Sequence, residues 1–203
     1  MLVTLGIIGV VSAMTVPTLM QNYQRKSYVT QLHKVYNEFV QAMLLFQSDK
    51  NALNLKEAGF LSQGAMDSFV KTYFKSVKEC NNTTSCFASE YKNISGRVIS
   101  SYNGNIKSYL LPSGVAMRLL YYPRNSIIAS AMIDINGQKG PNIVCRDLFF
   151  LYIYSNGRID SHNNFQPAQA PLTSEQRENS FSLTNDGEGC FGKILNDNWE
   201  MTY

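Results

Sequence analysis

The first 24 residues, Met1 to Gln24, contain no charged side chain. The rest of the chain is also poor in charge: 16% of all residues are charged, the net charge is +3, and there are only two histidines. So small a charge excess, without a Lys/Arg cluster along one face, argues against nucleic acid as a partner. The scarcity of histidine leaves few positions for histidine-based catalysis.

The uncharged N-terminal run is apolar enough to be read as a membrane-spanning helix. From Met1 to Met20 it would extend about 30 Å, which is the thickness of a bilayer core. A secretory signal would carry basic residues before the apolar stretch, whereas here the charges of Arg25 and Lys26 follow it. We therefore predict residues 1–24 to be a transmembrane or assembly segment.

Small residues occur within this segment and favour close packing of neighbouring helices. Gly6 and Gly9, after Leu5, would let neighbouring helices approach closely. Pro17 lacks a backbone donor and predicts a kink or a local opening of the helix. These four positions are our candidates for an assembly helix.

Beyond Pro17 the apolar residues recur every three or four positions, as on one side of a helix. They are Tyr28, Leu32, Val35, Tyr36, Phe39, Met43 and Phe46. The pattern predicts an amphipathic second half over residues 25–50, packed on the chain's own head, with a surface for a partner as the alternative.

Residues 51–203 are expected to form that head, with helices over residues 51–58 and 63–77. From about Arg97 the sequence pattern is typical of β-strands: short apolar runs are separated by turn residues. The predicted strands are VISSY, IKSYLL, GVAMRLLYY, SIIASAMIDI, DLFFLYIY and CFGKIL, with turns at residues 102–105 and 155–158 and a long surface loop over 161–189. The expected fold class is α+β: a long N-terminal helix packed on an antiparallel sheet.

Four cysteines, an even number, favour disulfides over a metal site. They are Cys80, Cys86, Cys145 and Cys190. Three pairings are possible, and proximity in the sequence favours Cys80 with Cys86, which leaves Cys145 with Cys190. Zinc is disfavoured because there is no CxxC pair and no histidine near a cysteine. Disulfides indicate an oxidising compartment.

No group of residues predicts catalysis. His33 is expected on the long helix as a solvated residue. His162 follows Asp160 and Ser161, but neighbours in one loop do not face one another as the members of a catalytic triad do. We therefore do not expect an enzyme or an organic cofactor.

One oxygen-rich turn is a candidate for a cation site. Asp134, Asn136, Asn142 and Asp147 alternate with glycines, which suits the six to eight oxygen ligands of calcium. Lys139 lies in the same loop, and the spacing of an EF-hand is absent. The favoured interpretation is a turn in which Asp134 and Asn136 bond to their own backbone, with calcium as the alternative.

The string LVTLGIIGVVSAMTVPTLMQNYQ resembles the N-terminal helix of type IV pilins and of type II secretion pseudopilins. In that family a glycine stands where Gly9 stands, and a helix-kinking proline stands where Pro17 stands. The segments LPSGVAM, DINGQKGPN, RDLFF and CFGKILNDNWEMTY are also similar to heads of type II secretion proteins.

The resemblance departs from the family at its beginning. The family motif continues upstream as Gly-Phe-Thr-Leu-x-Glu behind a basic leader, and this chain begins inside the helix. We expect Met1 to be an internal methionine taken as the start. No processing residue can be carried over onto this sequence.

The resemblance implies a structural subunit of an extracytoplasmic filament, in a type IV pilus or a type II secretion system. Its expected partners are copies of itself, related pilins and the assembly machinery, with the inner membrane as its place before assembly. The expected localisation is single-pass in the inner membrane with a periplasmic head. The alternative function is a membrane-tethered binding or adhesion module that does not polymerise.

Overall fold

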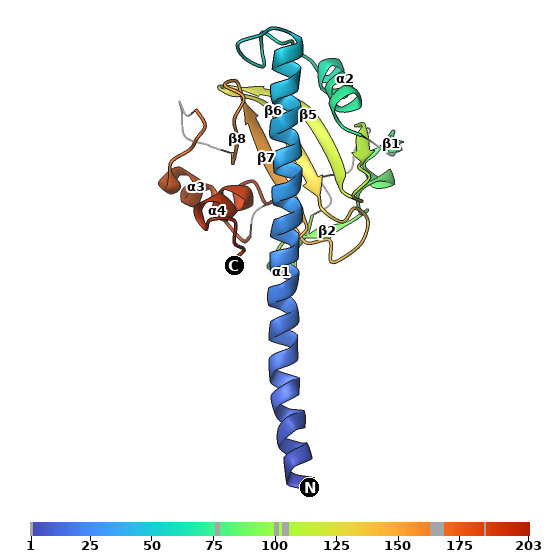
Figure 1. Cartoon of the computed structure of the whole chain (residues 1–203), viewed down its shortest axis with the longest axis vertical. Coiled ribbons are helices and arrows are strands. Elements are labelled where there is room, and N and C mark those ends of the chain that lie inside the picture. Colours follow the sequence, from blue (N-terminus) through green and yellow to red (C-terminus); the bar gives the residue numbers. More distant parts are fainter. Residues whose placement is uncertain (1, 76–77, 100–101, 103–105, 163–168, 185) are drawn as a thin grey trace.

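The computed structural model describes the chain except residues 1, 76–77, 100–101, 103–105, 163–168 and 185, and except the side chains of residues 2–12, 14 and 18. Helix α1 (Leu2–Asp49) is one continuous α-helix. Its second half lies across one face of an antiparallel sheet, and its first half projects beyond the head (Figure 1). The predicted α+β class, with a long helix packed on an antiparallel sheet, is confirmed.

The sheet has six strands in the order β1-β4-β5-β6-β7-β8, and every neighbouring pair is antiparallel. Their bounds are β1 Lys78–Cys80, β4 Ser108–Leu110, β5 Ala116–Arg124, β6 Ile127–Asp134, β7 Leu148–Tyr154 and β8 Ile159–Asp160. A separate two-stranded sheet pairs β2 (Tyr91–Lys92) with β3 (Val98–Ile99). The predicted turn at residues 155–158 joins β7 to β8, where Gly157 adopts a φ of 79° that favours glycine.

The remaining helices are short, and two of them begin at residues whose side chains cap them. Helix α2 (Gln63–Tyr73) begins after Ser62, whose side chain accepts from the backbone N–H of Ala65. Helix α3 (Ser174–Ser180) begins with a capping box between Thr173 and Gln176. Helix α4 (Cys190–Asn196) and a 3-10 turn (Thr83–Ser85) complete the elements.

The main core lies between α1 and the sheet. Val29, Leu32, Val35, Phe39, Met43 and Phe46 of α1 are buried there. The ring of Phe39 lies 5.0 Å from that of Phe74, and the ring of Phe46 lies 4.9 Å from that of Phe60. Full burial of each such side chain contributes about 2–3 kcal/mol. The amphipathic stripe therefore packs on the chain's own head, as predicted.

A second core covers the opposite face of the sheet. Here Phe150, Tyr152 and Tyr154 of β7 meet residues of the connecting segments, among them Phe87 and Leu172. Both faces of the sheet are thus covered. Side chains on both faces of β7 are therefore buried, which explains why this strand is apolar at every position.

Four predictions about local structure differ from what the structure shows. Residues 51–58 form turns, because Asn51 leaves the helical region with a φ of 49°. CFGKIL belongs to helix α4, and the 161–189 segment contains helix α3. Pro17 does not interrupt α1. The turn predicted at residues 102–105 lies mostly outside the described residues.

The predicted localisation is also wrong. Within the part of the chain that the structure describes, no helix carries an apolar stretch long enough to cross a membrane. Single-pass insertion in the inner membrane is therefore not supported.

Candidate assembly surface

Among the described side chains of α1, a row of exposed apolar residues lies just before the helix reaches the head. Val16, Leu19, Met20 and Tyr23 have exposed fractions between 48% and 76%. Their spacing of three, one and three places all four on one side of the helix. We call these four residues the stripe. A row of exposed apolar side chains on one side of a helix is a candidate for a site of interaction.

The stripe is rotated away from the head-packing face of α1. Each residue turns the helix by 100°, so the stripe lies about 150° around the axis from the row that contains Leu32, Val35 and Phe39. The exposed side chain of Gln21 lies on the other side from the stripe. The two apolar faces of α1 therefore serve different neighbours: one faces the chain's own sheet, and the other faces outward.

The four residues predicted for the assembly helix all lie on this projecting part of α1. Pro17 is exposed and next to the stripe. Leu5, Gly6 and Gly9 lie in the helix, and the surroundings of their side chains are outside the described part. The stripe itself was not singled out from the sequence, although its spacing is legible there.

Both predicted disulfides are present. Cys80 pairs with Cys86, and Cys145 pairs with Cys190, with Cα–Cα separations of 6.0 and 5.5 Å. The second bond fastens the start of α4 to the segment before β7, so it holds the end of the polar loop against the sheet. This is the connection expected from the sequence.

The oxygen-rich turn is held together by its own backbone. Asp147 accepts from the N–H groups of Asn142 and Ile143, both at 2.7 Å. Asp134 accepts from the N–H of Asn136 at 3.0 Å and from the hydroxyl of Tyr91. The side-chain amide of Asn136 donates to the carbonyl of Gly140 at 3.0 Å.

These contacts fit the turn interpretation of that loop. Burial, with a smaller contribution from the neighbouring Asp147, raises the pKa of Asp134 to about 7. The described residues contain no group of three or more His, Cys, Asp or Glu side chains arranged to hold a metal ion. Calcium binding at Asp134, Asn136, Asn142 and Asp147 stays a prediction.

The two histidines lie in unlike surroundings. His33 is stacked on Trp199, with ring centroids 3.9 Å apart. His162 is buried, and its ring lies 4.8 Å from that of Tyr152. Among the described residues neither ring nitrogen of His162 has a hydrogen-bond partner, although Nδ1 lies 3.5 Å from a carboxylate oxygen of Glu188.

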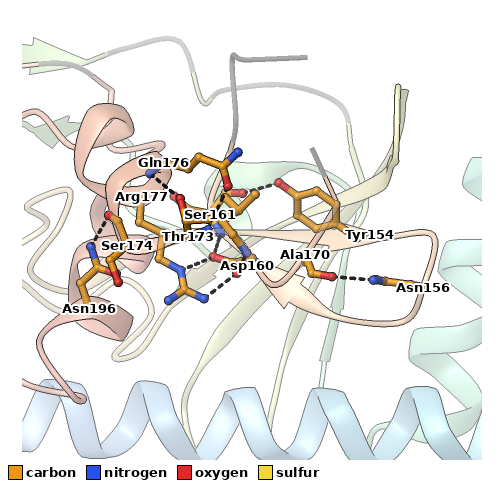
Figure 2. A network of polar contacts seen from close by, with 11 residues as sticks. Tyr154, Asn156, Asp160, Ser161, Ala170, Thr173, Ser174, Gln176, Arg177 and Asn196 are labelled. Atoms are coloured by element: carbon orange, nitrogen blue, oxygen red, sulfur yellow. Dashed lines mark hydrogen bonds and ion pairs between the residues drawn. The ribbon is translucent and has the colours of Figure 1, made fainter. Parts of the chain in front are cut away.

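Asp160, the neighbour of His162 in sequence, is engaged elsewhere. It forms a two-point ion pair with Arg177, at 2.8 Å from Nε and 2.7 Å from Nη2 (Figure 2). Asp160 also accepts from the backbone N–H groups of Ser161 and Leu172. These contacts fix α3 against the edge of the sheet, and they leave Asp160 no free oxygen with which to orient His162.

Comparison of the chain with models of protein families, with curated proteins and with solved structures finds no match.

Proposed function

We propose that this chain is a structural subunit, a pilin or pseudopilin, of an extracytoplasmic filament, and that it assembles through α1. The observation that carries the proposal is the stripe: an apolar face, largely exposed among the described residues, on a helix that projects from a completed head. A second copy is the partner that such a helix suits best, because identical copies can repeat the same contact along an assembly.

Three features support the proposal. The head has its own core and does not need the projecting half of α1 to cover it. Two disulfides suit an oxidising environment, where an extracytoplasmic filament works. The N-terminal string resembles the helix of a family whose members polymerise.

Removal of residues 1–24 tests this function. The shortened chain begins at Arg25, just before the buried row that starts at Val29, so the head keeps its core. We expect the full chain to form filaments visible by electron microscopy and the shortened chain to stay dispersed while retaining the head's circular dichroism. Filaments formed by the shortened chain would refute the proposal.

A further inference from the structure

A groove beside α1 offers a second apolar surface, on the head. It runs between the outward side of the helix and the turn that follows β4. Its apolar lining includes Ala42, Leu45, Phe74, Leu111 and Pro112. Leu45 at its end is 57% exposed, whereas Ala42, Phe74 and Leu111 are buried and form the floor of the groove. The polar side chains of Lys34, Glu38, Gln41 and Lys75 also line it.

The stripe and the groove lie on the same side of α1. Tyr23 and Leu45 are separated by 22 residues, which is close to six whole turns. Their side chains therefore point in similar directions from the helix, about 33 Å apart along its axis. When one of two parallel helices is turned by about half a turn around its axis and shifted by this length, the stripe of one copy faces the groove of the other.

The charges specify the direction of that contact. In the parallel arrangement, Tyr23 of one copy lies at the same height along the helix axis as Leu45 of the other. Lys26 of the first copy then lies within one residue of the height of Asp49 of the second copy. In the antiparallel arrangement Asp49 would instead lie level with the apolar Leu19. Among the described residues neither Lys26 nor Asp49 has an ion-pair partner, and Asp49 only accepts from the hydroxyl of Tyr73.

We infer that the stripe of one copy docks, parallel and shifted by about 33 Å, in the groove of a second copy, with Lys26 beside the second copy's Asp49. This inference rests on the proposed function and specifies its contact. The two surfaces are different, so each added copy leaves one stripe and one groove free. A contact of this kind does not close and continues as an open filament.

Paired cysteines test the contact directly. All four native cysteines are in disulfides, so Tyr23→Cys and Leu45→Cys supply the free thiols. Under mild oxidation of assembled material, the double variant should give a ladder of covalent dimers, trimers and higher species. Each single variant should stay monomeric on a non-reducing gel, because Tyr23 meets Leu45 and not another Tyr23.

Each departure from that pattern has a defined meaning. A double variant that stops at dimers indicates an antiparallel closed pair, and a Tyr23→Cys dimer indicates contact between two stripes. Either result overturns the inference, as does the absence of cross-links in filaments that form normally. In all three cases the filament function itself survives, whereas a parent chain that forms no filament at all refutes the function.

Charge exchange supplies an independent readout. Lys26→Glu should raise the concentration needed for assembly roughly two- to fivefold, because an exposed ion pair becomes a repulsion. Adding Asp49→Lys should restore the parent value. The matched control is Lys56→Glu, an exposed lysine away from both surfaces, which should leave assembly unchanged. Failure of the double variant to recover would overturn the pairing.

Discussion

Arg177 donates two hydrogen bonds to the carboxylate of Asp160, from Nε at 2.8 Å and from Nη2 at 2.7 Å. The two residues are 17 positions apart in the sequence. The pair joins α3 to β8 (Figure 2). Asp160 is only 1% exposed, so solvent screens the pair weakly.

Asp160→Asn should destabilise the head by about 3 kcal/mol, because it leaves the Arg177 guanidinium largely buried without its counter-charge. The measurement is urea unfolding followed by circular dichroism. Asp186→Asn is the matched control, since the Arg97–Asp186 pair is more than half exposed and should cost less than about 1 kcal/mol. Equal losses in the two variants would contradict this account of the buried pair.

Asp134 should make the head less stable as the pH rises towards neutrality. Burial raises its pKa to about 7 in the folded head, whereas an unfolded aspartate titrates near pH 4. Its contribution to stability is therefore complete below about pH 4 and is lost as the pH rises through about 7. Asp134→Asn should flatten this decline in a series of melting curves from pH 4 to 8.

The matched control for Asp134 is Glu175→Gln, an exposed carboxyl in the first turn of α3. It should leave the pH profile unchanged. An Asp134→Asn profile that falls as steeply as that of the parent would show that another group governs the decline. Asp147, whose pKa burial also raises, is the next candidate.

His162 should make the head less stable as the pH falls below neutrality, the opposite of the effect of Asp134. Burial lowers its pKa, partly offset by Glu188, so its contribution to stability is present above about pH 6.5 and is lost as the pH falls below that value. His162→Phe fills the site beside Tyr152 and removes two ring nitrogens without hydrogen-bond partners among the described residues. We expect melting temperatures at pH 5 to rise relative to the parent.

The replacement His33→Phe provides the comparison for His162. His33 stacks on Trp199 at the surface of the helix–head contact, and phenylalanine can keep that stacking. The melting temperature of the His33→Phe variant at pH 5 should then match that of the parent. A gain at pH 5 from His33→Phe as large as that from His162→Phe would contradict the assignment.

The two disulfides should contribute unequally to stability. Cys145–Cys190 closes a sequence separation of 45, and Cys80–Cys86 closes one of 6. On the loop-entropy model these bonds contribute about 4 and about 2 kcal/mol. Replacing each pair by alanines and measuring unfolding in urea should show a larger loss for the pair that includes Cys190.

Residues with a regular apolar spacing made most of the fold predictable. The row through Leu32, Phe39 and Phe46 specified the packed half of α1, and the β-branched and aromatic runs specified β5, β6 and β7. The run CFGKIL was misread because six apolar-rich residues fit a strand or a buried helix equally well. Its buried residues Cys190, Phe191 and Ile194 follow the helical spacing.

The surface features depended on long-range contacts and were harder to foresee. Arg177 and Asp160 meet only because α3 folds back on β8, and the sequence gives no local sign of that return. The groove is built by α1 together with the turn after β4, which are distant in sequence. The stripe was accessible from spacing, but only the fold shows that the head leaves it uncovered.

The central claim is that the stripe joins copies of the chain, and sedimentation of one pair of variants tests it most directly. Leu19→Glu places a carboxylate within the stripe, while Gln21→Glu places the same charge on the other side of the same helix. We predict that the parent and Gln21→Glu sediment as filaments under conditions in which Leu19→Glu remains monomeric with an unchanged head. Filaments from Leu19→Glu equal in amount and length to those of the parent would contradict the claim.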